Sequence, residues 1–577
     1  MNYATSPVLA LHLPLWRSRL LLVLIAGGFL VLAGRAVYLQ GLNNDFLQQK
    51  GESRYSRVLE ISANRGKITD RHGEALAIST PVKSVWAIPE EVQYSSRQRD
   101  KLAALLEMSP REIDKRLNDA TGFVYLKRQI PPEVAERVSE LRIAGLFQDR
   151  EYRRYYPGGD VMAQVLGFTG ADDVGQEGIE LAFQSTLGGK SGSRRVIKDR
   201  LGQIVEDTES IREAQNGRDL VLALDARLQN LAFSQLKLAV NSSKAKAGAI
   251  VVLDAKTGEV LALANLPTYN PNNRSQLSGA QLRNRVITDT FEPGSTLKPF
   301  TVAAAIEQGK VTPATMIATA GGSMSIGRAV IHDAHRFGDM TVAQVIQRSS
   351  NVGAAKIALG LSAESMWAMF DEVGFGSPPR VGFPGEAAGK LRAYKTWRPI
   401  EQATMAYGHG ISVSLLQLAH AYTIFAHDGE LMPLSLLRVD TPPAGEQVIS
   451  AATAHKLRDM LELAVQPGGT APRARVMGYR VAGKTGTAHK EENGGYAEHK
   501  YVSSFVGLAP ASDPRLVIAV MLDEPYAGSG QYYGGVVAAP VFSAVMGGAL
   551  RMLGVPPDAP LKPLELPPEG SEIKESV

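Results

Sequence analysis

The sequence predicts an α+β protein with three parts: a single N-terminal transmembrane helix, an irregular mixed domain, and a domain whose antiparallel sheet is flanked by helices. Three observations lead to this prediction. The chain has 577 residues, which is too many for one domain. An apolar run without charges lies near its N-terminus. From residue 218 onward, strand patterns come first, helical patterns follow and strand patterns return, which is typical of an antiparallel sheet with a helical insertion.

The apolar run at 20–34 predicts a membrane anchor. A spanning helix needs about 20 residues, so we place the transmembrane helix at 20–40. Arg17 and Arg19 precede the run and no acidic residue does, so the positive-inside rule keeps 1–19 in the cytoplasm and exports everything after the anchor. The alternatives are a buried core helix and a cleaved signal peptide, but the bulky residues after the run offer no small-x-small cleavage site.

Residues 41–217 are predicted to form the irregular mixed domain. They are rich in Arg, Glu and short turn signals, most clearly in RGKITDRHGEALA at 65–77, RRYYPGGD at 153–160 and GQEGIE at 175–180. Arg and Asp beside Gly fix loops by local hydrogen bonding. Taken alone, these segments therefore indicate turns and no catalytic chemistry.

Residues 218–555 are predicted to form the sheet-containing domain. AGAIVVLDAKTGEVLALAN at 247–265 is typical of a hairpin turning at Lys256 to Gly258, and apolar strands are expected at 503–510 and 515–524. The Pro- and acid-rich tail at 556–577 is predicted to be disordered.

Composition excludes several classes of protein. With 62 Lys and Arg against 58 Asp and Glu, the formal net charge is +4, which is too even for the concentrated basic face of a nucleic-acid-binding protein. The absence of cysteine excludes disulfides, cysteine-ligated metals and a cysteine nucleophile. We expect no nucleic-acid partner, no metal and no cofactor.

The sharpest chemical signal is FEPGSTLKPF at 291–300. Ser295 is expected to open a helix on which Lys298 shares its face, because residues three apart are neighbours on a helix. A neutral lysine can take the proton of a serine hydroxyl. Lowering a lysine pKa from about 10.4 to about 7 costs roughly 4.6 kcal/mol, which burial and a second cation can supply. The same pattern also arises by chance, and serine is an ordinary helix cap.

Two further segments support a serine hydrolase-like site. RSSNVG places Ser349 and Asn351 two residues apart, where one short turn can direct both toward a pocket. VAGKTGTA places Lys484 on a strand with Gly486 beside it, a bare edge against which an extended peptide can lie. The three segments, in this order, resemble the Ser-x-x-Lys, Ser-x-Asn and Lys-Thr-Gly motifs of penicillin-binding proteins and serine β-lactamases.

The resemblance implies a role for each residue on the catalytic side. Ser295 would attack the D-alanyl-D-alanine carbonyl of a peptidoglycan stem peptide, and Lys298 would act as its base. Ser349 and Asn351 would relay protons and position the substrate. The fold would be a penicillin-binding transpeptidase domain, and β-lactams would acylate Ser295.

The same resemblance implies a set of substrate-binding residues. Lys484, a catalytic-site residue, would bind the substrate carboxylate together with Thr485 and Thr487, and Gly486 would leave the strand edge open. The N–H groups of Ser295 and Thr487 would form the oxyanion hole. His409, in YGHG, would line the pocket.

Other motifs in the sequence are weaker. GYRVAGKT at 478–485 matches a P-loop expression, but no buried strand precedes it and no helical pattern follows it, as phosphate binding requires. His332 and His335 lie near two aspartates, a pattern better explained by a solvated loop than by a metal site.

The surroundings of the motifs are similar to those of class B penicillin-binding proteins. The turn-rich segments of 41–217 resemble the noncatalytic pedestal, or dimerisation-like, domain of that class, and SSNVG resembles the division-specific FtsI type, also called penicillin-binding protein 3. This resemblance implies a septal peptidoglycan D,D-transpeptidase anchored in the inner membrane with a periplasmic catalytic domain. It also implies partners: a SEDS-family glycosyltransferase and other division proteins.

Three alternatives within the fold stay open at this point. They are an elongation-specific class B transpeptidase, a D,D-carboxypeptidase that uses water as acceptor, and a β-lactam sensor. No glutamate in the Glu-x-x-Leu-Asn pattern of class A β-lactamases follows the serine, so a β-lactamase is disfavoured.

Overall fold

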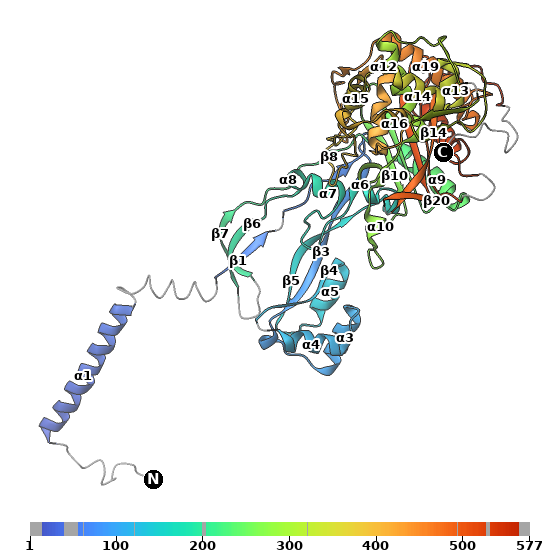
Figure 1. The fold of residues 1–577 in the computed structure, drawn as a ribbon. Helices are drawn as coiled ribbons and strands as arrows, with labels where there is room; N and C mark the ends of the chain where they lie inside the picture. Colours follow the sequence, from blue (N-terminus) through green and yellow to red (C-terminus); the bar gives the residue numbers. More distant parts are fainter. Residues whose placement is uncertain are drawn as a thin grey trace. The chain divides into compact units, whose positions relative to one another are not determined.

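The computed structural model describes residues 14–39, 56–61, 63–120, 122–198, 204–319, 321–492, 494–526 and 531–564. The chain divides into two compact units (Figure 1). The first unit comprises Met1–Ala63, Pro81–Glu151 and Lys190–Gln215, and the second comprises Asn64–Thr80, Tyr152–Gly189 and Asn216–Val577. The domain that we predicted at 41–217 is thus shared between the two units.

The N-terminal apolar segment is the helix α1 (Leu15–Val37). It has 23 residues, a mean hydropathy of 2.4 and no buried residue. At 1.5 Å per residue it is about 35 Å long, enough for a bilayer core of about 30 Å. It begins five residues before the predicted anchor, because Arg17 and Arg19 continue the helix instead of preceding it. The predicted end of the anchor, residue 40, lies outside the described residues.

A second helical segment, Gly534–Met552, is also long and apolar enough to span a membrane, with a hydropathy of 1.5. It is 61% buried inside the second unit, so it is a core element of that unit. Among the residues with described placement, α1 is therefore the candidate for a membrane anchor.

The first unit contains two small sheets. In one, β1 (Ser56–Ile61), β6 (Gly192–Lys198) and β7 (Ile204–Arg212) pair antiparallel. The other is formed by parts of β3 (Ala75–Ala87), β4 (Val124–Ile130) and β5 (Leu146–Tyr155). Three helices pack on it around buried residues such as Val85 and Leu126: α3 (Ser96–Leu105), α4 (Pro110–Asp119) and α5 (Pro132–Glu140).

The second unit is built on a five-stranded antiparallel sheet with the order β10-β9-β21-β20-β19. Its strands are β9 (Ala247–Asp254), β10 (Val260–Leu266), β19 (Ala482–Glu492), β20 (Gly495–Ala509) and β21 (Leu516–Asp523). The predicted hairpin at 247–265 and the predicted strands at 503–510 and 515–524 are confirmed. β19 lies at the edge of the sheet, which leaves its outer side available to the nucleophile segment.

Helices cover both faces of this sheet, as expected from a strand such as β9 in which every residue is buried. One face packs against α9 (Ala226–Ser242) and α21 (Ala539–Met552). The other packs against a larger helical group (Figure 1). That group includes α12 (Lys298–Glu307), α13 (Val342–Arg348), α14 (Asn351–Leu359), α17 (Leu415–Ala421) and α19 (Ala451–Val465).

All three predicted turn segments meet in a buried ion network within the second unit. Arg65 Nε donates to Glu180 at 2.6 Å and Arg154 Nε donates to the same carboxylate at 2.7 Å. All three side chains are almost closed to solvent. These ion pairs link residues 115 and 26 positions apart, so they differ from the local hydrogen bonds that we predicted from Arg and Asp beside Gly.

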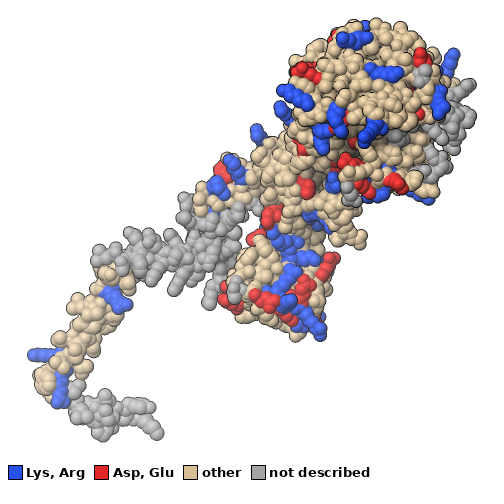
Figure 2. Space-filling view, viewed as in Figure 1, with Lys and Arg blue, Asp and Glu red and all other residues tan. Residues whose placement is uncertain are grey.

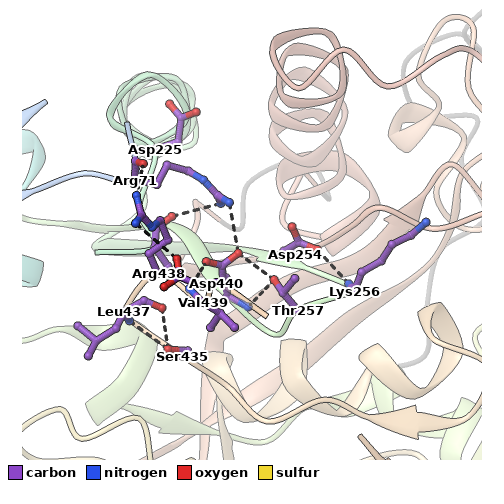
Figure 3. Close-up of polar contacts among 12 residues, drawn as sticks. Arg71, Asp225, Asp254, Lys256, Thr257, Ser435, Leu437, Arg438, Val439 and Asp440 are labelled. Atoms are coloured by element: carbon purple, nitrogen blue, oxygen red, sulfur yellow. Dashed lines mark hydrogen bonds and ion pairs between the residues drawn. The ribbon is translucent and has the colours of Figure 1, made fainter. Parts of the chain in front are cut away.

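Another part of the segment at 65–77, ITDRHGE, contacts the hairpin of β9 and β10 through Glu259. Figure 3 shows the labelled residues Arg71, Thr257 and Val439 of this group of polar contacts. Arg71 Nη2 donates to Glu259 Oε2 at 3.3 Å, and the Thr257 hydroxyl donates to the same oxygen at 2.9 Å. The backbone N–H of Val439 donates to Glu259 Oε1 at 2.9 Å. One buried carboxylate thus joins three distant parts of the chain.

The C-terminal segment differs from the prediction over its first residues. Asp558 accepts hydrogen bonds from the Arg480 N–H at 2.7 Å and from the Ser512 hydroxyl at 2.7 Å. Residues 556–564 are therefore attached to the second unit, because the Asp558 carboxylate accepts from two donors there. Residues 565–577 lie outside the described part of the chain.

Surface charge agrees with the near-neutral balance. On the face shown in Figure 2, Lys and Arg side chains alternate with Asp and Glu over both units. On this face, the described residues form no concentrated basic patch for a polyanion.

Candidate active site

The predicted nucleophile, Ser295, lies in a short 3-10 turn, η5 (Gly294–Leu297), directly before α12. The prediction that Ser295 opens a helix carrying Lys298 is correct, except that the first turn is tighter than an α-helix. Gly294 has φ 57°, and a Cβ there would lie 3.3 Å from the Thr487 carbonyl oxygen. Glycine therefore lets this turn pack closely against β19.

Lys298 contacts the nucleophile directly. Its Nζ donates to Ser295 Oγ at 2.9 Å and to Ser349 Oγ at 3.0 Å, and it also contacts the Ser349 carbonyl oxygen. Ser295 is 3% exposed and Lys298 is fully buried. The i and i+3 relationship predicted from the sequence thus places a base candidate within hydrogen-bond distance of the hydroxyl.

Ser349 ends α13 in a left-handed conformation with φ 62° and ψ 40°. The chain reverses there, and Ser350 caps α14, which begins at Asn351. One short turn therefore brings Ser349 and Asn351 together, as predicted. The Asn351 Oδ1 is buried and, among the described residues, has no hydrogen-bond partner, so it is an acceptor held ready on this turn.

Asp333 holds this turn, and the sequence did not identify it in that role. Its carboxylate accepts from the Asn351 N–H at 2.6 Å, the Val352 N–H at 3.0 Å and the Ser350 hydroxyl at 2.7 Å. It follows the strand β14 (Ala329–His332), which pairs with β13 (Ser323–Ile326). An acid beside two histidines can be read from the sequence, but its contact with a helix that begins 18 residues later cannot.

The two histidines near Asp333 belong to the segment that precedes α13 and the Ser349 turn. In the described part of the chain, no group of three or more His, Asp or Glu side chains could hold a metal ion. Instead the His332 carbonyl oxygen accepts a hydrogen bond of 3.4 Å from the Asn351 amide. The segment supports the Ser349 turn.

Lys484 on β19 reaches the same oxygen as Lys298. Its Nζ donates to Ser349 Oγ at 2.9 Å and to Thr485 Oγ1 at 3.3 Å, and it is fully buried. Because Lys484 lies within a strand and not before a helix, the P-loop expression has no phosphate-binding geometry here. Two lysines from distant segments therefore meet at one serine hydroxyl.

The other residues of the β19 motif are arranged in different ways. The Thr487 hydroxyl accepts from the Gly534 N–H at 3.1 Å. The Thr485 hydroxyl lies 2.8 Å from the Thr470 hydroxyl in the interior, and either oxygen can be the donor of that bond. A Cβ on Gly486 would lie 2.6 Å from the Pro293 carbonyl oxygen. Glycine at position 486 thus allows the nucleophile turn to pack against β19. This role adds to the predicted one, which was to leave the strand edge open.

His409 lies close enough to Lys298 to be affected by its charge. Its ring is half-buried, with its centroid 5.1 Å from that of Tyr407 and 6.1 Å from that of Tyr496. Burial lowers the pKa of His409 to about 4, and the charges of Lys298 and His489 act in the same direction. The imidazole is therefore neutral at pH 7. The adjacent Gly408 has φ 86°.

The geometry suits acyl transfer to a serine. A hydroxyl in reach of a buried lysine can be deprotonated as it attacks a carbonyl. The backbone of η5 and β19 meets at the nucleophile, where N–H groups can stabilise a developing oxyanion. Ser349 lies between both lysines and can pass protons from one to the other.

Comparisons with known proteins agree with this geometry. Residues 248–547 match the penicillin-binding protein transpeptidase domain, and residues 60–222 match the penicillin-binding protein dimerisation domain. The chain is 42% identical over 550 residues to the probable peptidoglycan D,D-transpeptidase PenA of Neisseria gonorrhoeae, covering 94% of each chain. It is 41% identical over 551 residues to the peptidoglycan D,D-transpeptidase FtsI of Escherichia coli, covering 94% of this chain and 93% of FtsI.

A solved structure shows the same fold for the second unit. The apo transpeptidase domain of Burkholderia pseudomallei penicillin-binding protein 3 is 51% identical, with a TM-score of 0.55. The match covers 59% of this chain and 98% of that domain.

Proposed function

The chain belongs to the class B penicillin-binding proteins of the penicillin-binding protein 3 type, and on that basis we propose a residue-level mechanism for its peptidoglycan D,D-transpeptidase activity. The observation that carries the mechanism is the 2.9 Å contact between Lys298 Nζ and Ser295 Oγ. When Lys298 is neutral, the Ser295 hydroxyl is the donor of this hydrogen bond and the lysine amine is the acceptor. Ser295 is then ready to attack a peptide carbonyl.

Acylation uses the first stem peptide as the donor. As Ser295 Oγ attacks the D-alanyl-D-alanine carbonyl, its proton passes to Lys298, and the N–H groups of Ser295 and Thr487 stabilise the oxyanion. The terminal D-alanine leaves with a proton supplied through Ser349, whose hydroxyl contacts both lysines. The product of this half-reaction is an ester on Ser295.

Substrate binding uses the remaining motif residues. Lys484, with Thr485, Gly486 and Thr487 of β19, would hold the donor carboxylate and its backbone, and Asn351 would bind the donor amide through its unpaired Oδ1. His409, which stays neutral at pH 7, would line the pocket without adding charge. A β-lactam would occupy the donor position and acylate Ser295.

We further propose the setting of the reaction from family membership. The helix α1 would cross the inner membrane once, with residues 1–19 in the cytoplasm and the rest of the chain in the periplasm at the division septum. The anchor and the pedestal segments would bind a SEDS-family glycosyltransferase and other division proteins. Family membership supports these partners.

The test uses the full chain in detergent and two variants. Intact mass is measured after incubation with benzylpenicillin for the native chain, Ser295→Ala and Ser365→Ala, which changes a serine on a distant helix. We expect one drug mass on the native chain and on Ser365→Ala, and none on Ser295→Ala. Native adduct that is lost within minutes would indicate a hydrolytic enzyme and contradict the proposal.

A second assay decides the acceptor. Stem pentapeptides are incubated with the native chain, and cross-linked dimers are separated from trimmed tetrapeptides by mass spectrometry. Dimers are the expected product. Tetrapeptides alone would assign a D,D-carboxypeptidase to this site.

A further inference from the structure

A cavity of about 360 Å³ lies beside the nucleophile turn. One wall is Phe291 and Glu292, from the segment that leads into Ser295, and the opposite wall includes Ala488 and Glu491 of β19. Its volume falls within the usual range for ligand pockets, about 300–1000 Å³. Three residues of chain span at most about 11 Å, so an occupant that contacts Glu292 is close to the nucleophile.

The cavity holds two carboxylates that no cation neutralises. In the described part of the chain, neither Glu292 nor Glu491 forms an ion pair, and the charge of Glu491 raises the pKa of Glu292 further. The other charged groups of the lining are paired, Arg285 with Asp289 at 2.7 Å and Lys490 with Asp523 at 2.7 Å. Two nearby carboxylates repel each other, and a cation between them removes that repulsion.

Glu292 is held in place by two donors. Its Oε1 accepts from the Gly410 N–H at 2.8 Å, and the Tyr496 hydroxyl donates to the carboxylate at 3.1 Å. The Tyr496 ring centroid lies 6.1 Å from that of His409, whose pKa the charge of Lys298 lowers. The Glu292 carboxylate is therefore linked through Tyr496 to His409, whose ring is affected by the charge of Lys298. Its burial is the main cause of its raised pKa.

This geometry has a use in the reaction, and the inference rests on the proposed function. Cross-linking requires a second stem peptide whose amine attacks the ester on Ser295. A free primary amine of this kind is an ammonium ion at neutral pH. It must be held beside the ester and must lose a proton before it can attack.

We propose that the cavity is the acceptor site and that Glu292 binds the ammonium group of the acceptor stem peptide. Glu491 supplies the second negative charge at the cavity mouth. The proton balance closes: the ammonium gives one proton to the Glu292 carboxylate and becomes an amine. The amine nitrogen then forms a bond to the acyl carbon while the bond from that carbon to Ser295 Oγ breaks, and the second amine proton returns to Ser295 Oγ.

The test separates the two half-reactions on the full chain in detergent. An N-acyl-D-alanyl thioester serves as donor, so that thiol release reports acylation. An uncross-linked stem tetrapeptide with a free side-chain amine serves as acceptor. Mass spectrometry then measures the aminolysis and hydrolysis products over a range of acceptor concentrations, which yields the acceptor KM and the limiting rate.

Three variants are compared with the native chain. We expect Glu292→Gln to raise the acceptor KM on the order of tenfold or more, because it loses a charge-assisted contact, and Glu292→Asp to recover part of the affinity. Glu498→Gln, an exposed acid on the same hairpin outside the cavity, should leave both half-reactions unchanged. Penicillin adduct formation confirms that each variant is folded.

Two outcomes would overturn the inference. In one, Glu292→Gln leaves the acceptor KM at the native value. In the other, it slows thiol release without acceptor as much as it weakens aminolysis, which would assign the carboxylate to the donor. A native chain that releases no thiol would instead contradict the proposed function, so the two failures are distinguishable.

Discussion

Lys298 and Lys484, which lie 186 positions apart in the chain, donate to the same atom, the hydroxyl oxygen of Ser349, at 3.0 and 2.9 Å. Both lysines are fully buried. Two ammonium groups on one oxygen repel each other, so the arrangement favours a single shared positive charge. Ser349 is the group through which a proton can move between them.

Removing the Ser349 hydroxyl should slow acylation on the order of 100-fold or more, the usual effect of losing a proton-transfer group. Ser349→Ala and Ser349→Gly both remove it. Because Ser349 has φ 62°, the glycine variant relieves strain and should be about 1 kcal/mol more stable than the alanine variant. Stopped-flow acylation and thermal unfolding test the two effects, and native-like acylation in either variant would exclude the relay.

Gly408→Ala should damage the nucleophile turn. A Cβ at this position would lie 2.2 Å from the Gly294 carbonyl oxygen, and φ 86° adds backbone strain. Gly410→Ala is the matched control, because it has φ 82° but its nearest atom is a flexible Arg392 nitrogen at 3.6 Å. Penicillin acylation should fall at least tenfold more in Gly408→Ala than in Gly410→Ala, and equal losses would mean that strain alone is responsible.

Asp333→Asn should weaken the cap on α14. The amide cannot accept as strongly from the Asn351 and Val352 N–H groups, which lie 2.6 and 3.0 Å from one carboxylate oxygen. We expect a loss of about 1–2 kcal/mol in unfolding free energy and slower acylation. The exposed Asp371→Asn serves as control. A variant with native stability and native acylation rate would show that the turn does not depend on the Asp333 carboxylate.

Glu180→Gln should be strongly destabilising. Its carboxylate binds two buried arginines, and removing its charge breaks a buried ion pair with each of them, at a cost of about 3–5 kcal/mol. Glu112→Gln removes an exposed pair with Arg116 and should cost about 0.5 kcal/mol or less. Calorimetry of both variants measures the difference. Similar small effects would mean that water reaches the Glu180 network.

His409 should make the protein less stable in mild acid. The folded protein keeps this ring neutral down to a pKa of about 4, whereas the unfolded chain binds its proton from about pH 6.5. The unfolded state therefore gains protons as pH falls from about 6.5 to about 4, and stability decreases in that window, by at most about 3 kcal/mol for a fully shielded ring. Because the ring is only half-buried, the effect should be smaller.

Replacing the ring tests this pH dependence. In His409→Phe, the drop in melting temperature between pH 7 and pH 5 should be smaller than in the native chain. His420, whose pKa is also lowered to about 4 by burial, supplies the same dependence in both proteins. An identical drop in the two proteins would indicate that His409 is protonated in the folded state.

The sequence by itself determined the parts of this protein that depend on local spacing. Ser295 and Lys298 are three residues apart, and Ser349 and Asn351 are two apart, so one turn places each pair. The hairpin at 247–265 and the apolar strands near the C-terminus follow from alternation and turn residues. The anchor is predicted from an uncharged apolar run. The residue at which its helix begins cannot be predicted in this way, because a helix can continue through arginines.

Only the tertiary structure decided which distant groups meet. Sequence spacing cannot show that Lys484 and Lys298 share one hydroxyl, that Asp333 caps the Ser349 turn, or that Glu292 faces an uncompensated acid across a cavity. It also could not divide 41–217 between two units, because that depends on the buried contacts of Glu180. Contacts of this kind arise when the sheet and its helical layers pack. Packing brings together residues whose separation in the sequence does not predict their distance in space.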